Sequence, residues 1–319
     1  MTSNSIYHLK NLGLPALTSL DEFAHAMKLG SNTVRSLSIS SNSLYRTYKE
    51  PKKSGGFREI AQPCRELKAI QSWILRNILD KLNSSPYSKG FEKGKSILDN
   101  AQPHVGASYL LSLDLEDFFP SIGSYKVYGI FRSIGYNKEM SKLLTNLCTY
   151  HGYLPQGAPS SPKLANLTCS RLDARIHGYA GPKGITYTRY ADDITLSGNT
   201  PLKIEKAKAF IGTIVREEGL NLNKNKTKIC GTKRQKKITG LVLSGNSVGI
   251  GQKKYRELRS ALHRLFVGRS HNYNFVNGWL AFASSVDKKA YKQLNTVIDS
   301  LSQKYPQSDA LKHLHVEKG

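Results

Sequence analysis

Apolar side chains follow two different periods along this chain, and each period predicts a different kind of element. From residue 65 to 82 they recur every three or four positions, which predicts an amphipathic helix. Residues 110–113 are instead an apolar run that ends in Asp114, which is typical of a buried strand carrying a carboxylate at its end. Residues 185–188 and 194–197 are rich in β-branched side chains, and the YADD tetrad between them completes a predicted hairpin.

Helix caps and turn residues divide the rest of the chain. Residues 19–22 form a capping box, so we expect a helix there that Gly30 ends, followed by a short helix at residues 33–37. Together they predict either a plain helical extension, which is favoured, or a helix-turn-helix. The Gly-Gly pair within residues 51–58 predicts a basic hairpin. Residues 154–162, LPQGAPSSP, form a loop that runs into a helix through a Ser-Pro start.

The charge balance narrows the class of partner. The chain has 319 residues, of which 47 are Lys or Arg and 23 are Asp or Glu, so its formal net charge is +24. This excess predicts a polyanionic partner, and nucleic acid is favoured over a membrane because no apolar stretch is long enough to span one. The first residues do not resemble a secretory leader, and the four cysteines are scattered without metal-ligand spacing. We therefore expect a cytoplasmic protein with reduced thiols and no zinc site.

Two adjacent carboxylates at the tip of the predicted hairpin are the strongest sign of chemistry. Asp192 and Asp193 repel each other unless a cation lies near them, which indicates a divalent metal site. An isolated Asp pair is more often a polar hairpin turn, so this interpretation depends on the acidic segment upstream. If the strand ending in Asp114 lies beside this hairpin, three carboxylates converge, a set suited to two Mg²⁺ ions in phosphoryl transfer. Glu116, which could share a strand face with Asp114, and Asp117 compete for the third position. Asp114 is preferred because it closes the apolar run.

Two basic segments are candidates to bind the polyanion. Residues 224–237 are Lys-rich, and we interpret this run as the flank of a nucleic-acid channel rather than a solvated loop. A helix predicted after Gly251 has leucines on one face and basic side chains over the rest, which favours nucleic acid over a membrane surface. The basic side chains of its first turns are Lys253, Lys254, Arg256 and Arg259.

The order of these segments resembles the palm of reverse transcriptases. It comprises the strand ending in Asp114, the LPQG loop, the YADD hairpin and a Lys-rich strand ending in ITG. Residues 100–104, NAQPH, are similar to the NAxxH motif of retron reverse transcriptases. Residues 238–240, ITG, are similar to their VTG motif, with Ile in place of Val. The resemblance covers nearly the whole chain.

This resemblance implies an α+β fold of the right-hand polymerase type. Residues 1–48 would be an N-terminal helical extension. Residues 49–250 would form the fingers and a palm whose antiparallel sheet carries the YADD hairpin. Residues 251–319 would form a helical thumb that binds RNA.

The resemblance also implies the metal-binding set. Asp114, Asp192 and Asp193 would be the catalytic residues, helped by the backbone carbonyl of Leu115. They would hold two Mg²⁺ ions, for which Mn²⁺ could substitute.

The residues around the incoming nucleotide are implied in the same way. Phe119 matches the bulky residue that screens the sugar 2′ position, and Phe118 is the alternative if the alignment is off by one. Lys226 matches the lysine that protonates the leaving pyrophosphate, with Lys224 and Lys228 left open as alternatives. The other residues implied to border the nucleotide and template are Arg58, Lys53, Gln156 and Gly157.

The remaining implied contacts are with primer and RNA. Thr239 and Gly240 would begin the primer grip, and the basic side chains after Gly251 would bind RNA. Asn100 and His104 lie in an insertion typical of retrons, where we expect contacts with the cognate RNA. A buried, hydrogen-bonded core position is an equal alternative for His104.

The implied activity is RNA-templated DNA synthesis from deoxynucleoside triphosphates. In retrons the primer is the 2′-hydroxyl of a guanosine in the enzyme's own structured non-coding RNA, the product is branched msDNA, and an effector protein acts with it in antiphage defence. One alternative is a group II intron-like or other prokaryotic reverse transcriptase, although those usually carry further regions for which 319 residues leave no room. Another is a vestigial RNA-binding scaffold, which the three intact aspartates disfavour because a scaffold gains nothing from adjacent charges.

Overall fold

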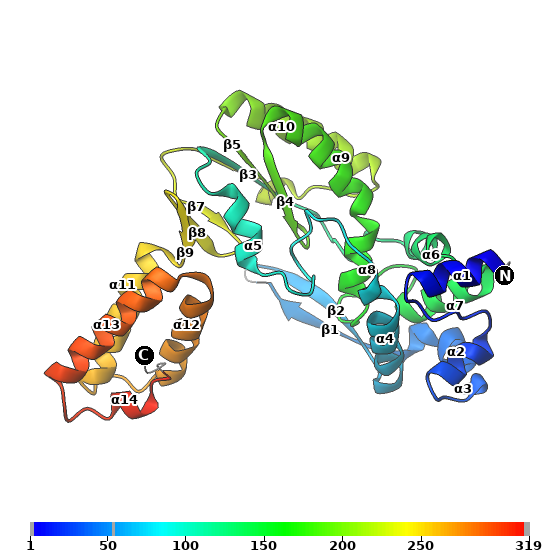
Figure 1. Ribbon diagram of the computed structural model, residues 1–319, viewed down its shortest axis with the longest axis horizontal. Coiled ribbons are helices and arrows are strands. Elements are labelled where there is room, and N and C mark those ends of the chain that lie inside the picture. The colour runs from blue at the N-terminus through cyan, green and yellow to red at the C-terminus, as the bar shows by residue number, and fades with distance from the viewer. Residues whose placement is uncertain (1–2, 53–54, 316–319) are drawn as a thin grey trace.

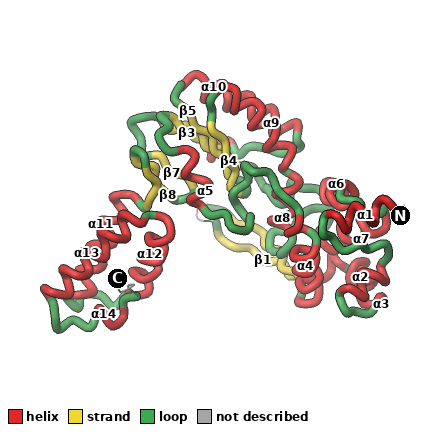
Figure 2. Tube along the Cα trace, viewed as in Figure 1, coloured by secondary structure: helices red, strands yellow, loops and turns green. Residues whose placement is uncertain are grey.

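Helices and antiparallel strands are mixed along the chain, which confirms the predicted α+β class. The computed structural model describes residues 3–52 and 55–315. It has an elongated shape in which the helical C-terminal part stands apart from the rest, joined to it through strands (Figure 1). Loops connect most of the helices directly, and the strands gather near the middle of the molecule (Figure 2).

The N-terminal helices form an extension that is docked on the rest of the protein. They are α1 (Ser3–Asn11), α2 (Leu20–Ala26) and α3 (Ser31–Ile39). The Phe23 ring meets Trp73 edge-on with centroids 5.4 Å apart, and Asn137 donates a hydrogen bond of 2.7 Å to the carbonyl of Thr18. The predicted cap is present, since Ser19 accepts from the Glu22 amide. The helix ends at Ala26, before the predicted stop at Gly30. These contacts fit a docked extension better than a free helix-turn-helix.

A two-stranded hairpin and three helices follow. Their bounds are β1 (Tyr45–Pro51), β2 (Phe57–Pro63), α4 (Arg65–Asn77), α6 (Ser124–Ser133) and α7 (Lys138–Cys148). The predicted helix over residues 65–82 is shorter in the structure. It ends at Asn77 because Ile78 leaves helical geometry (φ −119°), and a short 3₁₀ turn at Leu79–Lys81 continues the chain.

A four-stranded sheet carries the predicted YADD hairpin. Its strands are β3 (Tyr109–Asp114), β4 (Thr186–Tyr190), β5 (Asp193–Gly198) and β6 (Lys228–Cys230), in the order β4-β5-β3-β6. The helices around it are α5 (Ile97–Ala101), α8 (Ser161–Thr168), α9 (Ser170–Ala180) and α10 (Pro201–Glu217). Helices α9 and α10 cover one face of the sheet, where Leu111, Leu113 and Ile194 join the main apolar core (Figure 1). Side chains alternate along a strand, so Asp114 and Asp193 belong to the opposite face.

The C-terminal part is built around a second apolar core, to which Ala101 of α5 and Leu110 of β3 also belong. Its elements are β7 (Lys236–Ile238), β8 (Leu241–Ser244), β9 (Ser247–Gly249), α11 (Gly251–Phe266), α12 (Tyr273–Val286), α13 (Lys288–Lys304) and α14 (Ala310–His313). Apolar side chains of the small β7-β8-β9 sheet, such as Leu241 and Val248, share this core with Leu262, Leu280 and Leu294 of the helices. The sheet thus shares a core with the C-terminal helices, whereas the expected boundary separates them at residue 251.

Candidate active site

The two predicted carboxylate clusters come together at one end of the four-stranded sheet. Strands β3 and β5 are antiparallel neighbours, and Asp114 lies directly opposite Asp193. Tyr190 pairs with Asp193, so Ala191 and Asp192 form a two-residue turn in which Ala191 has a φ of +56°. The Leu115 amide donates a hydrogen bond of 3.0 Å to the carbonyl of Asp192. The chain thus places Asp114, Asp192 and Asp193 together at one end of the four-stranded sheet, as the sequence predicted.

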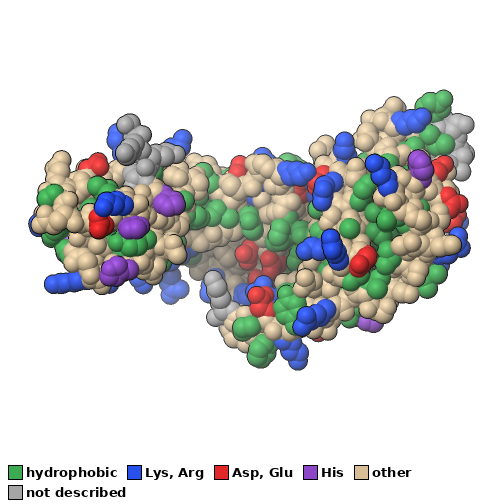
Figure 3. Space-filling model, turned by 90° about the horizontal axis from the view of Figure 1, so that it is seen from below, with side chains coloured by type: hydrophobic (Ala, Val, Ile, Leu, Met, Phe, Trp, Pro, Cys, Tyr) green, Lys and Arg blue, Asp and Glu red, His purple; other side chains and the backbone are tan. Residues whose placement is uncertain are grey.

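These carboxylates are electrostatically unfavourable on their own. Burial raises the pKa of Asp193 to about 6, and repulsion from Asp192 and Asp114 adds to the shift, while Lys226 opposes it. Burial and then Asp114 also raise the pKa of Asp192, against Lys226 and Arg58. Because burial and mutual repulsion disfavour the charged forms of these carboxylates, a divalent cation would supply the positive charge that this end of the sheet lacks. Figure 3 shows acidic side chains gathered in the hollowed centre of one face.

The donor set suits a hard divalent cation. Carboxylate oxygens, a nearby backbone carbonyl at Leu115 and open solvent are the ligands that Mg²⁺ accepts. Within residues 3–52 and 55–315, however, no three His, Cys, Asp or Glu side chains are grouped so that they could already hold an ion. Asp114 is paired with Lys226 instead. The residues fit a metal centre whose completion requires Asp114 to exchange that partner.

Lys226 is the lysine of the basic run that reaches the carboxylates. Its Nζ donates a hydrogen bond of 2.8 Å to Asp114 Oδ1, and this bond raises the pKa of Lys226. Lys224 lines a groove beside α10, and Lys228 is exposed on β6. The structure thereby singles out one of the three lysines left open by the sequence.

The two competing acids lie away from this edge. Glu116 is exposed and lines the groove beside α10 together with Lys208 and Arg216. The possibility that it shares a face with Asp114 is therefore wrong, because Glu116 lines the same groove as Leu113, whose side chain belongs to the face of the sheet opposite Asp114. Asp117 is also exposed and has a φ of +42°.

A buried polar network holds the YADD turn from behind. Arg189 and Asp173 form an ion pair with no exposed side-chain area, in which Nε and Nη2 each donate a bond of 2.7 Å to the carboxylate. Tyr187 donates to the same carboxylate at 2.6 Å. Arg189 Nη1 donates to the carbonyl of Ala191 at 3.0 Å. Arg189 thus holds the carbonyl of Ala191, the left-handed residue of the turn that carries Asp192.

The polar network continues through Asn166 to the segment around Gly90. Asn166 accepts from Arg189 Nη1 at 3.1 Å and donates to the carbonyl of Gly90 at 2.7 Å. A Cβ at Gly90 would lie 2.7 Å from the Ala191 amide nitrogen, so only glycine allows this close approach. The sequence analysis missed Arg189, Asp173, Asn166 and Gly90. The available signal was a charged Arg inside a strand whose other residues are Thr and Tyr.

The LPQG loop is joined to the β1-β2 hairpin. The Ala61 amide donates a bond of 2.9 Å to the carbonyl of Gln156. Gly157 has a φ of +133°, and a Cβ there would lie 2.8 Å from the Ala61 carbonyl oxygen. Arg58 lies on β2, 3.9 Å from Glu50, and its charge lowers the pKa of Asp192. The predicted nucleotide residue Lys53 lies outside the described residues.

The two adjacent phenylalanines have different surroundings. Phe118 is 5% exposed and belongs to the core. Phe119 is only partly buried, with its ring 5.4 Å from that of Phe118. Of the two, Phe119 is the one with surface left for a ligand.

The turn predicted to begin the primer grip is well formed. Ile238 pairs with Leu241, and Thr239 and Gly240 between them have φ of +45° and +88°. Two positive φ values are typical of a tight hairpin turn between twisted strands. The buried Thr239 hydroxyl has no hydrogen-bond partner within the described protein.

His104 and Asn100 are not placed to contact RNA, which corrects that expectation. Both side chains are fully buried. His104 lies between the hydroxyls of Ser197 and Thr188, at 2.7 and 2.8 Å, and burial lowers its pKa to about 4. It is a neutral core histidine, because desolvation disfavours the charged ring.

The basic residues on α11 fall into two groups. Lys253, Arg256 and Arg259 are exposed. Lys254 instead pairs with Glu257 at 2.7 Å and lies 4.3 Å from the centre of the Trp279 ring. Three of the four side chains predicted to bind RNA are therefore exposed, and the fourth is engaged by an acidic side chain and an aromatic ring of the protein itself.

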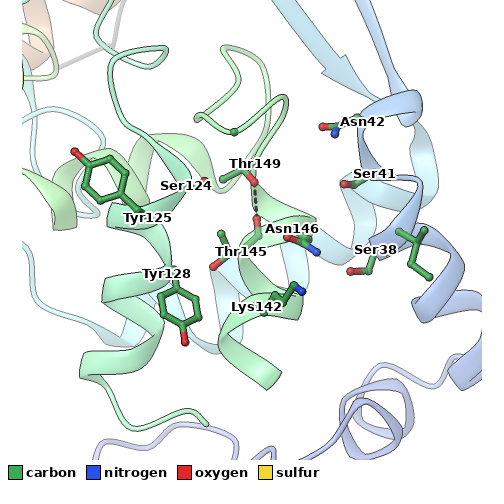
Figure 4. Close-up of a pocket in the computed structure, with 12 residues that line it drawn as sticks. Ser38, Ser41, Asn42, Ser124, Tyr125, Tyr128, Lys142, Thr145, Asn146 and Thr149 are labelled. Atoms are coloured by element: carbon green, nitrogen blue, oxygen red, sulfur yellow. Dashed lines mark hydrogen bonds between the residues drawn. The ribbon is translucent and has the colours of Figure 1, made fainter. Parts of the chain in front are cut away.

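A second hollow lies apart from the carboxylates. This cavity of about 570 Å³ is lined mainly by hydroxyl and amide side chains from α3, α6 and α7, with Lys142 as its charged residue. Figure 4 shows that Tyr125 and Tyr128 border it and that the Thr149 hydroxyl donates a hydrogen bond to the carbonyl of Thr145. It contains none of the predicted site residues.

In the described part of the chain, no helix is long and apolar enough to cross a bilayer.

The sequence of this chain is similar to those of known proteins. The family model for reverse transcriptase (RNA-dependent DNA polymerase) matches residues 50–243. The retron Ec86 reverse transcriptase of Escherichia coli is 52% identical over 301 residues, 94% of each chain. The retron Mx65 reverse transcriptase of Myxococcus xanthus is 35% identical over 80% of this chain and 65% of the relative. Among solved structures, a telomerase from Candida albicans in complex with a telomeric RNA fragment aligns with a TM-score of 0.48 and 13% identity, over 84% of this chain and 62% of that one.

Proposed function

This chain belongs to the retron reverse transcriptases, and from that premise we propose that Asp114, Asp192 and Asp193 form its polymerase centre. Membership makes the protein an RNA-directed DNA polymerase with a right-hand fold and an RNA template. The observation that carries the proposal is the strand register that sets Asp114 opposite Asp193. A scaffold that only binds RNA has no use for three carboxylates that repel one another.

The carboxylates, with the Leu115 carbonyl, would hold two Mg²⁺ ions, for which Mn²⁺ could substitute. Bound there, the ions would neutralise charge on the phosphates and on both oxygens of the displacement. The primer hydroxyl gives its proton to solvent, its oxygen bonds to the α-phosphorus of a deoxynucleotide, and the bond from that phosphorus to the pyrophosphate oxygen breaks. Lys226, the lysine of the basic run that reaches this centre, gives a proton to the leaving pyrophosphate.

The surrounding residues orient the substrates. Arg58 contacts the triphosphate from β2. Gln156 and Gly157 border the nucleotide and template. The hydrogen bond from the Ala61 amide to the Gln156 carbonyl fixes the position of this loop relative to the β1-β2 hairpin. Thr239 and Gly240 support the primer end. Extension of a DNA primer on an RNA template with Mg²⁺ tests this assignment, since RNA binding without extension would favour the vestigial scaffold.

The retron-specific part of the function rests on the relatives. The enzyme copies its own structured non-coding RNA in the cytoplasm, primed by the 2′-hydroxyl of a guanosine, and yields branched msDNA. It acts with an effector protein in antiphage defence. Sequencing of nucleic acid that copurifies with the protein tests this, because a 2′-linked RNA–DNA branch is its specific mark.

We expect Phe119→Val to admit ribonucleotides while sparing deoxynucleotide incorporation. A ribose 2′-hydroxyl against the Phe119 ring loses its water without gaining a partner. That costs about 1–3 kcal/mol, or roughly ten- to a hundredfold in selectivity. Single-nucleotide incorporation measures the ratio. If Phe118→Ala relaxes selection instead, and Phe119→Val only lowers the melting temperature, the gate is Phe118.

We expect joint replacement of Lys253, Arg256 and Arg259 by Gln to weaken binding of the cognate RNA. Each phosphate contact that is lost removes roughly 0.7–0.9 units from the slope of log affinity against log salt. Lys254→Gln is the matched control, because Lys254 is held by Glu257 and Trp279, and it should change the slope less. An unchanged slope for the triple variant in a salt titration would place the RNA elsewhere.

A further inference from the structure

Phe91 is an exposed aromatic residue held in an unfavourable conformation. Its φ is +59°, a region that bulky residues rarely adopt, and 47% of its surface is exposed. Buried partners pin its two neighbours. Asn166 donates to the Gly90 carbonyl at 2.7 Å and to Glu92 at 2.8 Å, and Lys163 pairs with Glu92 at 2.7 Å. Strain that the surrounding structure maintains in this way is concentrated at functional sites.

The exposed ring faces the proposed sugar gate. The centroids of Phe91 and Phe119 are 6.2 Å apart with the rings inclined at 45°. Phe119 also meets Phe118, which is anchored in the core. Both separations lie in the range in which aromatic pairs attract. Phe119 therefore has an aromatic contact from the core and another from the pinned segment.

We propose that Phe91 is a specificity-determining residue that positions the Phe119 ring against the sugar of the incoming nucleotide. This inference rests on the proposed role of Phe119. A ring without its Phe91 contact can tilt away, and a 2′-hydroxyl then meets less resistance. Gly90 adds a second function to the same segment, because its close approach to Ala191 ties the gate to the metal-binding turn.

The test compares deoxy- and ribonucleotide incorporation by the full chain on an RNA template with a DNA primer. Phe91→Ala should lower the ratio of the two kcat/KM values about 2- to 10-fold, the range open to one lost aromatic contact. Phe91→Leu, which keeps apolar bulk without the ring, should fall between Phe91→Ala and the unaltered chain. Phe91→Leu also replaces Phe91→Ala as the test variant if Phe91→Ala unfolds at too low a temperature to be assayed. Phe210→Ala is the matched control, since Phe210 is 48% exposed and stacked on Tyr179 at 4.2 Å, on the other side of the palm sheet. Its ratio should not change.

A double-variant comparison separates this inference from the proposed gate. In a Phe119→Val background, Phe91→Ala should lower the ratio no further, because the ring it positions is gone. If Phe119→Val relaxes selection and Phe91→Ala leaves it intact, the inference is overturned and the gate stands. An equal effect of Phe91→Ala in both backgrounds also overturns it, since Phe91 would then act without Phe119. If neither single variant relaxes selection, the proposed gate is itself wrong.

Discussion

Joint replacement of Asp192 and Asp193 by Asn should abolish DNA synthesis and leave RNA binding almost unchanged. Loss of two of the carboxylates proposed to bind metal removes several kcal/mol of transition-state stabilisation, so extension should fall roughly a thousandfold or more. RNA affinity comes instead from Lys and Arg contacts to phosphate. Primer extension and RNA binding, measured on the same preparation, give the two readouts.

The double variant should also unfold at a higher temperature than the unaltered chain, or at the same one. The raised pKa values of Asp192 and Asp193 mean that folding disfavours their charged forms at neutral pH. Neutral amides of the same shape remove that strain, so activity and stability move in opposite directions. Asp117→Asn is the control, because Asp117 is an exposed acid of the same segment that is not among the three proposed metal ligands, and this variant should extend normally. Measurable polymerisation by the double variant would refute the assignment of the centre.

The carboxylates could be predicted from the sequence because they depend on local rules. An apolar run fixes where a buried strand ends, and a tight turn between two β-branched runs fixes where its tip lies. Once the two strands are neighbours, Asp114 and Asp193 must meet. Gly157 could be proposed for the same reason, since a glycine loop before a helix is a local signal.

The residues that hold this site could not be predicted in the same way. Arg189 and Asp173 meet only because α9 packs on β4, which no local pattern encodes. The choice of Lys226 over its neighbours depends on the 3₁₀ turn at Lys224–Lys226, which sets the side chain that faces Asp114. His104 was ambiguous because a histidine suits either RNA or a core, and its two hydroxyl partners lie far away in sequence.

Arg189→Met should be the most destabilising single replacement in the palm. It leaves the Asp173 carboxylate buried without its cation, which costs about 3–5 kcal/mol for a fully buried pair. Denaturant unfolding measures this. Arg175→Met is the matched control, since Arg175 pairs with Glu218 at a partly exposed position, where such pairs are worth about 0–1 kcal/mol.

The triple variant Tyr187→Phe, Asp173→Leu, Arg189→Met separates stability from activity. It removes both charges and the hydroxyl that would lose its acceptor, so most of the stability should return, as when a buried ion pair is replaced by apolar side chains. Activity should not return, because the Ala191 carbonyl still lacks its donor and the left-handed conformation, which costs roughly 1–2 kcal/mol, is no longer held. The turn would then sample positions in which Asp192 and Asp193 cannot act together. Extension that recovers in parallel with the unfolding free energy would show instead that Arg189 only stabilises the fold.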